Sequence, residues 1–228
     1  MAFREGEGVS ADPTNGFRFL SEAYRATAPD YIGRFRVPVL WDKKQARIVS
    51  NDDDHIMRML NSEFDAFTDS PLNLHPESLR GEIDRVNGLV YPNVNDGVYR
   101  AGFATNQRAY EAAVTRLFEM LDELEERLSV QRYLIGDRIT EADWRLLTTL
   151  VRFDAVYYVH FKCNVRRIAD YPSQGGYLRD LYYQPGVSET VNFDHIKRHY
   201  YFTHFDINAY RIVPVGPAQN LDEPHGRG

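Results

Sequence analysis

A helix start at Thr140 constrains this chain more than any other feature, because a long apolar segment follows it. Asp143 stands three positions after Thr140, which is the spacing of a capping box: the hydroxyl takes the amide of Asp143, and the carboxylate takes the amide of Thr140. Ile139 before the cap and Trp144 one turn inside suit a hydrophobic staple. Apolar residues then recur through Phe153. The pattern predicts a helix that begins just after Thr140 and lies in the centre of a helical domain.

The remainder of the second part of the chain also predicts helices. The clearest is expected over residues 106–128, where the leucines share one face and most acidic residues the other. Pro92 is expected to break or kink the chain after a helix that starts at Pro76. The tail from Val213 onward, rich in Pro and Gly, is expected to be extended over the surface. Further helices are expected over residues 76–91, 172–183 and 192–201.

The first part of the chain has a different pattern. Residues 1–16 are expected to form a loop and residues 17–27 a short helix. Two apolar runs at 37–41 and 48–49 flank a polar turn, which is typical of a β-hairpin. Three aspartates at 52–54 suit the start of another helix. We therefore expect a small strand-containing domain over residues 1–62 and an all-helical domain over residues 63–228.

Composition excludes several classes of protein. The 27 Lys and Arg are scattered and are outnumbered by 33 Asp and Glu, which argues against a nucleic-acid partner. The sequence contains neither a membrane-spanning run nor a signal peptide, so a cytoplasmic protein without membrane association is expected. One cysteine, Cys163, permits no internal disulfide and no cysteine-based zinc site.

Several segments resemble one particular family. Gly136–Trp144 is similar to the motif that opens the central helix of the helical domain in glutathione transferases. More specific segments resemble the glutathionyl-hydroquinone reductases, or Xi-class (omega-like) glutathione transferases. They lie at residues 37–44, 56–61, 95–104, 160–164, 192–201 and 221–227. The resemblance implies a mainly α fold, in which a partial thioredoxin-like α/β front precedes an all-helical bundle.

The resemblance also implies a reaction and its partners. Family members use glutathione to reduce glutathionyl-hydroquinones to hydroquinones and are typically homodimers that need no metal. The reaction needs a thiolate that attacks the sulfur on the ring, and a proton donor for the ring carbon. In the family the thiolate belongs to a Cys-Pro-Trp segment, which this sequence lacks. Cys163 is expected to be a small buried residue rather than a replacement.

Other candidate site residues follow from the same resemblance. Val37 and Pro38 match the segment whose proline is cis and whose backbone pairs with the cysteinyl part of glutathione. Asp52 and Asp53 stand where the family has the residues that bind the γ-glutamyl end. Asp53 would set like charge against the ligand carboxylate, which leaves a different small thiol open. Negative charge at a helix start is the alternative explanation of both.

Tyr99 and Tyr200 match the tyrosines that flank the aromatic-substrate pocket of the family. A phenol beside a hydroquinone can hydrogen-bond its oxygen or transfer a proton, so both are candidate catalytic residues. Among 15 Tyr, any single one can also be a packing residue. His195 and His199 have the i, i+4 spacing of zinc ligands, but no carboxylate completes a known motif and no metal is expected.

Two functions remain open. The first is a thiol-dependent glutathione transferase or reductase, for which this chain supplies the aromatic-substrate pocket and part of the thiol site. The second is a truncated, non-catalytic module that binds ligand or forms dimers. Without the preceding strands of a thioredoxin-like fold, the hairpin is expected to be the less stable part and to leave an exposed edge.

Overall fold

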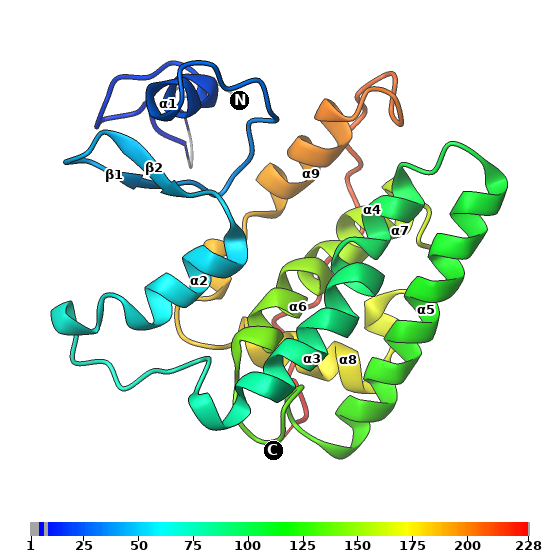
Figure 1. The fold of residues 1–228 in the computed structure, drawn as a ribbon. Helices are drawn as coiled ribbons and strands as arrows, with labels where there is room; N and C mark the ends of the chain where they lie inside the picture. Colours follow the sequence, from blue (N-terminus) through cyan, green and yellow to red (C-terminus); the bar gives the residue numbers. More distant parts are fainter. Residues whose placement is uncertain (1–4, 7–8, 228) are drawn as a thin grey trace. The chain divides into compact units, whose positions relative to one another are not determined.

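The computed structural model describes residues 5, 6 and 9–227, which form two compact units, residues 1–73 and 74–228 (Figure 1). We expected the division after residue 62. The loop that follows, with the short 3₁₀ turn η1 (Asp65–Phe67), belongs to the first unit. Among the described residues the only sheet has two strands, and helices make up most of the remainder. The mainly α, transferase-like fold class is thus confirmed.

The first unit is a helix followed by a β-hairpin and a second helix. Its elements are α1 (Leu20–Thr27), β1 (Leu40–Asp42), β2 (Arg47–Ser50) and α2 (Asp53–Ser62). The strands are antiparallel, with Trp41 opposite Ile48 and a bulge beside Leu40. The hydroxyl of Thr27 accepts from the backbone amide of Ile48 at 2.8 Å and so ties α1 to β2.

The core of this first unit is small. Leu20, Ala23, Tyr24 and Ile56 are its buried hydrophobic residues. Val49 of β2 keeps 51% of its surface exposed. A two-stranded hairpin with so little burial is marginal by itself, since sheets gain stability from further strands or a packed helix.

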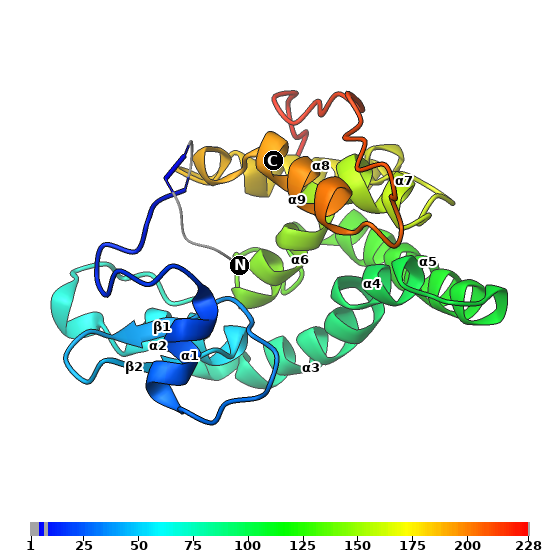
Figure 2. The ribbon, with the colours of Figure 1, turned by 90° about the horizontal axis from the view of Figure 1, so that it is seen from above.

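The second unit is a helical bundle with a much larger core, and its tail from Val213 to Arg227 contains no helix or strand. Helix α6 is central: it packs against α3 on one side and α8 on the other, while α5 packs against α4 and α8 (Figures 1 and 2). Its helices are α3 (Arg80–Val90), α4 (Gly97–Gly102), α5 (Gln107–Val130), α6 (Glu141–Arg152), α7 (Tyr158–His160), α8 (Pro172–Tyr182) and α9 (Phe193–Thr203). Its shorter turns are η2 (Glu77–Leu79), η3 (Tyr91–Asn95), η4 (Phe153–Tyr157), η5 (Ile168–Asp170) and η6 (Ser188–Thr190).

Pro92 does not end its helix. The chain passes from α3 into α4 through η3, a π-helical turn in which the amide of Asp96 donates to the carbonyl of Tyr91 at 2.8 Å. Pro92 follows α3 without a break, and the wider π turn accommodates its ring and its missing amide inside the helix. The expected break or kink is therefore a local widening, after which α4 begins at Gly97.

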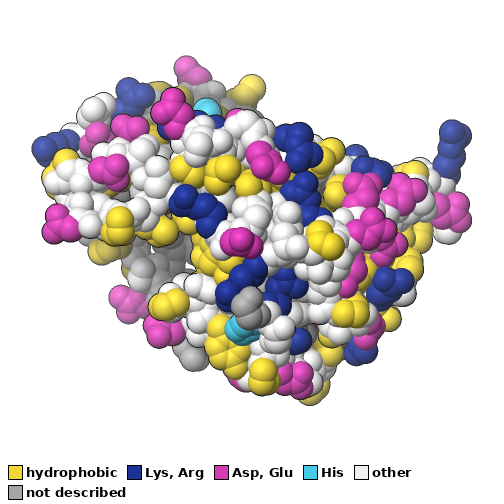
Figure 3. Space-filling view, turned by 90° about the horizontal axis from the view of Figure 1, so that it is seen from below, with side chains coloured by type: hydrophobic (Ala, Val, Ile, Leu, Met, Phe, Trp, Pro, Cys, Tyr) yellow, Lys and Arg dark blue, Asp and Glu magenta, His cyan; other side chains and the backbone are white. Residues whose placement is uncertain are grey.

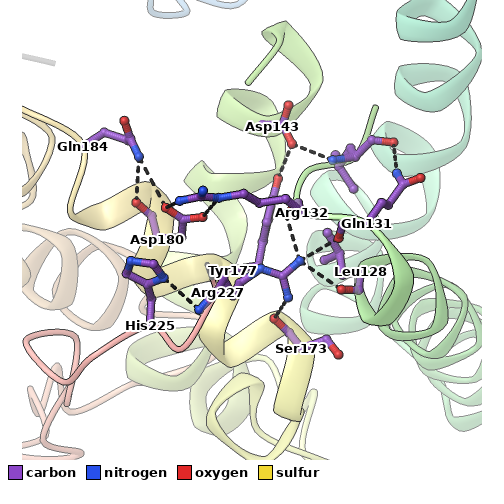
Figure 4. Close-up of polar contacts among 11 residues, drawn as sticks. Leu128, Gln131, Arg132, Asp143, Ser173, Tyr177, Asp180, Gln184, His225 and Arg227 are labelled. Atoms are coloured by element: carbon purple, nitrogen blue, oxygen red, sulfur yellow. Dashed lines mark hydrogen bonds and ion pairs between the residues drawn. The ribbon is translucent and has the colours of Figure 1, made fainter. Parts of the chain in front are cut away.

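The capping box at Thr140 is present and belongs to a larger buried network around Asp143. Figure 4 shows the contact of Asp143 with Tyr177. The Asp143 carboxylate accepts from the amide of Thr140 at 2.7 Å and from its hydroxyl at 2.9 Å. It also accepts from the amide of Leu134 and from the hydroxyl of Tyr177, each at 2.9 Å. Burial raises the pKa of Asp143, and these hydrogen bonds oppose the rise. We call these four residues the Asp143 network; it joins the loop before α6 to α8.

The end of the tail is fixed beside this network. The Arg227 guanidinium donates to four backbone carbonyls, at distances from 2.7 to 3.2 Å (Figure 4). These acceptors lie at the end of α5, in the loop after it and in the first turn of α8: Leu128, Gln131, Arg132 and Ser173. Helix ends leave carbonyls without partners, so an arginine fork there satisfies several at once. The tail is extended, as predicted, and its last described residue is anchored.

Candidate functional site

Three tyrosine hydroxyls converge in the second unit. Tyr99 comes from α4, Tyr157 from η4 and Tyr200 from α9. The Tyr200 oxygen lies 2.5 Å from that of Tyr99 and 2.8 Å from that of Tyr157, and the Tyr99 and Tyr157 oxygens are 3.5 Å apart. The structure thus brings the two predicted tyrosines into direct contact and adds a third. We call these three residues the tyrosine cluster.

Burial keeps the inner members of the cluster protonated. Tyr157 is 2% exposed and Tyr200 is 5% exposed. Burial, followed by the neighbouring phenols, raises the pKa of Tyr157 well above its usual value, and burial raises that of Tyr200 as well. Tyr99 is only partly buried. Tyr157 and Tyr200 are therefore neutral hydroxyls, and Tyr99 is the member nearest to solvent.

Close aromatic packing holds the cluster in place. The Phe161 ring is stacked on Tyr157, with centroids 5.4 Å apart, and meets Tyr99 and Tyr200 edge-on. Phe161 approaches α4 at Gly102, where a Cβ atom would lie 2.2 Å from its ring. Only glycine permits that approach, so Gly102 determines where the Phe161 ring and the phenols packed against it can lie.

Sequence reasoning missed Tyr157. It lies in a buried apolar run with no charged neighbour but Asp154, and 15 Tyr in the chain give no reason to select it. One weak signal was present, since the family-like segment at residues 160–164 begins three positions later. The partners of Tyr157 are 58 and 43 positions away in sequence, so only the fold reveals them.

Cys163 is a core residue, as predicted. Its side chain is fully buried, and burial raises the pKa of its thiol to about 12. The sulfur lies 3.8 Å from the carbonyl of Phe161 and 4.0 Å from that of Val98. A thiol in this setting stays protonated at neutral pH, so Cys163 is not a nucleophile.

The residues predicted to bind glutathione lie in the first unit. The Val37–Pro38 peptide is cis, as predicted, and Val37 is 56% exposed. Asp52 is the N-cap of α2, where its carboxylate accepts from the amide of His55 at 2.9 Å, and Asp53 is the first residue of that helix. This capping role accounts for Asp52 without a ligand.

The metal-like spacing of His195 and His199 does not form a site. Across the described residues, no group of three His, Cys, Asp or Glu side chains could hold a metal ion. Within the same part of the chain, no helix is long and apolar enough to cross a membrane. On the face shown in Figure 3, acidic and basic side chains are interspersed among apolar ones, without a large patch of one sign.

A cavity of about 590 Å³ lies between α4 and α5 of the second unit. Tyr99 and Phe103 line it, and both also belong to the aromatic packing around the tyrosine cluster. Its charged lining is already paired: Arg100 contacts Asp96 at 3.3 Å, and Arg116 contacts Glu119 at 3.2 Å. A volume of this order accommodates an aromatic ring with substituents.

Comparisons with known proteins agree with this architecture. Residues 107–180 match the family model for the glutathione S-transferase C-terminal domain. The chain is 52% identical to glutathionyl-hydroquinone reductase YqjG of Escherichia coli, over 96% of this chain and 67% of that protein. It is 50% identical to glutathionyl-hydroquinone reductase PcpF of Sphingobium chlorophenolicum, over 96% of this chain and 70% of that one.

Solved structures give the same result. The glutathione-bound structure of YqjG superposes with a TM-score of 0.97 at 51% identity, over 99% of this chain and 74% of that chain. Glutathione transferase Xi 1 of Trametes versicolor superposes with a TM-score of 0.92 at 51% identity, over 95% and 76% of the two chains. Identity of this order over nearly the whole chain establishes more than a shared fold. This chain belongs to the glutathionyl-hydroquinone reductases, the Xi class of the glutathione transferases.

Proposed function

We propose that this chain acts in the thiol-dependent reduction of glutathionyl-hydroquinones, and that its tyrosine cluster is the proton donor for the aromatic ring. The observation that carries the proposal is the contact of three phenols, one of which, Tyr99, also lines a cavity. Named relatives that perform this reduction support it. Glutathione is the proposed thiol, since a relative's structure contains it.

The reaction can be written so that its electrons balance. The thiolate of a second glutathione attacks the sulfur that joins the first glutathione to the ring. A sulfur–sulfur bond forms, and the carbon–sulfur bond breaks and leaves its electron pair on the ring carbon. That carbon takes a proton from Tyr99 and the free hydroquinone leaves. The two sulfurs are oxidised to a disulfide while the ring carbon is reduced.

The cluster stabilises the phenolate that this step leaves on Tyr99. Tyr200, 2.5 Å away, donates a hydrogen bond to it, and Tyr157 holds Tyr200 from the other side at 2.8 Å. Hydrogen bonds to a charged oxygen are stronger than those between neutral groups, so this help grows as charge develops. Solvent then returns a proton to Tyr99, the partly exposed member.

Cys163 does not supply the attacking thiolate. Cys163 is the one cysteine in the sequence, and its buried thiol has a pKa of about 12. The thiolate of a second glutathione makes the attack in this proposal. In this proposal Val37, Pro38, Asp52 and Asp53 bind the glutathione portion, as their counterparts do in the family.

The direct test is an assay of the 228-residue chain with a glutathionyl-hydroquinone and glutathione, in which hydroquinone and glutathione disulfide are quantified. We expect equal amounts of both products, unchanged turnover in Cys163→Ser, and a loss of about 100-fold in kcat in Tyr99→Phe, the usual scale for a lost general acid. Tyr210→Phe is the matched control, because Tyr210 is 88% exposed.

Two outcomes would overturn the proposal. Full activity in Tyr99→Phe would exclude the cluster as the proton donor. Binding of the conjugate by calorimetry without turnover would instead assign the chain to the non-catalytic, ligand-binding alternative. Homodimer formation, which the family resemblance implies, is a further part of the proposal, and sedimentation velocity would test it. The cytoplasmic location stays a prediction from the sequence pattern alone.

A further inference from the structure

Two histidines from distant parts of the second unit form a hydrogen-bonded pair beside the tyrosine cluster. The Nε2 atom of His160 lies 3.2 Å from the Nδ1 atom of His204, and their rings are nearly parallel, at 17°. His160 ends α7, three positions after Tyr157, and His204 is the C-cap of α9, four positions after Tyr200. The pair therefore joins the two segments that carry the inner phenols, η4 with α7 and the end of α9, and η4 packs against α9.

The His204 side of the pair also contacts Tyr200. The amide of His204 donates to the Tyr200 carbonyl at 3.3 Å, which is the i, i+4 hydrogen bond that closes α9. His204 therefore has a fixed backbone position relative to Tyr200. The His204 ring also lies edge-on to the Tyr200 ring, with centroids 5.5 Å apart.

The hydrogen bond between the imidazoles requires that only one of the two facing nitrogens carries a proton. An N–H on either ring must meet a bare nitrogen on the other, so protonation of both facing nitrogens would break the hydrogen bond. Burial and the neighbouring His204 and Lys162 lower the pKa of His160 to about 4, and burial with His199 lowers that of His204. Both rings are thus neutral at physiological pH, and the pair is intact there.

The surrounding groups favour this neutral state from every packed element. Helix α9 presents His199, Tyr200 and Tyr201, and the segment after α7 presents Lys162. Arg152 at the end of α6 acts on His199 and Tyr200, and Phe103 follows α4. Among the described residues, no carboxylate is one of the groups that shift the pKa of either histidine. The Tyr200 backbone favours a charged His160, but burial and the neighbouring cations outweigh it.

We propose that His160 and His204 are positioning residues for the reductase: their hydrogen bond clasps η4–α7 to the end of α9 and so holds the Tyr200 hydroxyl against Tyr99 and Tyr157. The inference rests on the proposed function of the cluster. The hydrogen bonds of the phenol oxygens do not include either imidazole, so the two histidines act by holding the end of α9 against η4 and α7. A misplacement of about 1 Å at a reacting group can cost about 100-fold in rate, so a hydrogen bond that fixes the position of Tyr200 can affect kcat.

Two substitutions of His204 separate the hydrogen bond from mere packing. Phenylalanine keeps a flat ring to stack on Phe161 but has no donor, whereas asparagine keeps an N–H near the position of Nδ1 and cannot be protonated in this range. We expect His204→Phe to lower kcat about tenfold with little change in KM, and His204→Asn to recover most of it. His195→Asn is the control, because the His195 side chain takes no part in these contacts.

A second readout does not depend on turnover. In protein labelled with ¹³C at the tyrosine ζ-carbon, the Tyr200 signal, assigned with Tyr200→Phe, reports its hydroxyl environment. That signal should move in His204→Phe and return in His204→Asn. In the wild type, acid that protonates both imidazoles should break the pair and shift the Tyr200 signal together with the imidazole signals of His160 and His204. This experiment tests the proposal if His204→Phe does not fold.

The outcomes are distinguishable. A Tyr200 signal that stays unchanged in His204→Phe and through the titration of both histidines would overturn the clasp, whatever the activity. If the wild type is inactive but the Tyr200 signal is displaced in His204→Phe, the clasp is supported and the proposed reductase function fails. Equal kcat in wild type and His204→Phe, with the Tyr200 signal displaced, would show that Tyr200 placement does not limit the rate and would overturn the positioning role.

Discussion

The Asp143 network and the tyrosine cluster are both buried sets of polar groups in the same helical unit, but they are built differently. In the first, one carboxylate accepts from four donors, and each hydrogen bond has a fixed direction because ionised Asp143 can only accept. In the second, three phenols that can each donate and accept meet one another without a carboxylate. The first fixes structure, and the second leaves its protons free to shift.

Their exposure differs in the same sense. Asp143, Thr140 and Tyr177 are fully buried, so no ligand can reach them. The tyrosine cluster extends from buried Tyr157 to partly buried Tyr99, which also lines a cavity. A buried polar group with all partners fixed contributes to stability and specificity, whereas one that opens toward a cavity can take part in chemistry. The predictions below test whether this division of roles is real.

The largest effect is expected on stability, from Asp143→Ala. The change leaves the amides of Leu134 and Thr140 and the hydroxyl of Tyr177 buried without their acceptor, at roughly 1–3 kcal/mol each and not fully additive. We expect a loss of about 4 kcal/mol in the free energy of unfolding, measured with urea by circular dichroism at 222 nm. Exposed Asp137→Ala, from the same loop, should change it by less than about 0.5 kcal/mol. A loss below about 1 kcal/mol for Asp143→Ala would contradict a structural role.

A smaller effect is expected where the tyrosine cluster depends on packing. In Gly102→Ala the new methyl group would lie 2.2 Å from the Phe161 ring, which must move and carry the stacked phenols with it. Overpacking of this kind costs about 1–3 kcal/mol, and we expect kcat to fall as well. Gly88→Ala in α3 is the matched control: its methyl group meets nothing within 4 Å, and it should stabilise the helix by about 0.5–1 kcal/mol. Equal stability changes in the two variants would show that Phe161 is free to relax.

These two regions also show what the sequence could predict. The start of α6 was predictable because the signal at Thr140 and Asp143 is local, three positions apart. The other hydrogen-bond donors to Asp143 were not predictable. Leu134 and Tyr177 lie 9 and 34 positions away and reach Asp143 only after the helices pack. The helix over residues 106–128, observed as Gln107–Val130, was predictable for the same reason: its periodicity is contained in the segment itself.

The candidate site was predictable only where family resemblance marked it. Resemblance selected Tyr99 and Tyr200 from 15 Tyr, but their mutual contact and the presence of Tyr157 depend on α4, η4 and α9 meeting in space. The histidines illustrate the same limit. The i, i+4 spacing drew attention to His195 and His199, whereas the structure pairs His160 with His204, 44 positions apart. A spacing rule detects neighbours on one helix and cannot detect partners on two.

A pair of matched tyrosine variants tests the comparison most sharply, with the smallest changes. Tyr177→Phe and Tyr157→Phe each remove one buried hydroxyl from an otherwise unchanged ring, so packing is held constant. Tyr177 donates to a carboxylate, and its loss should cost about 1–2 kcal/mol of stability without altering kcat. Tyr157 hydrogen-bonds Tyr200, and without it Tyr200 still has Tyr99 as a partner, so Tyr157→Phe should cost less stability. It should lower kcat about tenfold, which is about 1.4 kcal/mol in the barrier.

Urea unfolding and reductase kinetics on the same two proteins would then rank the two variants in opposite order. If both variants lost stability and neither lost activity, the tyrosine cluster would be a second structural network, and the proton for the hydroquinone ring would have to come from elsewhere.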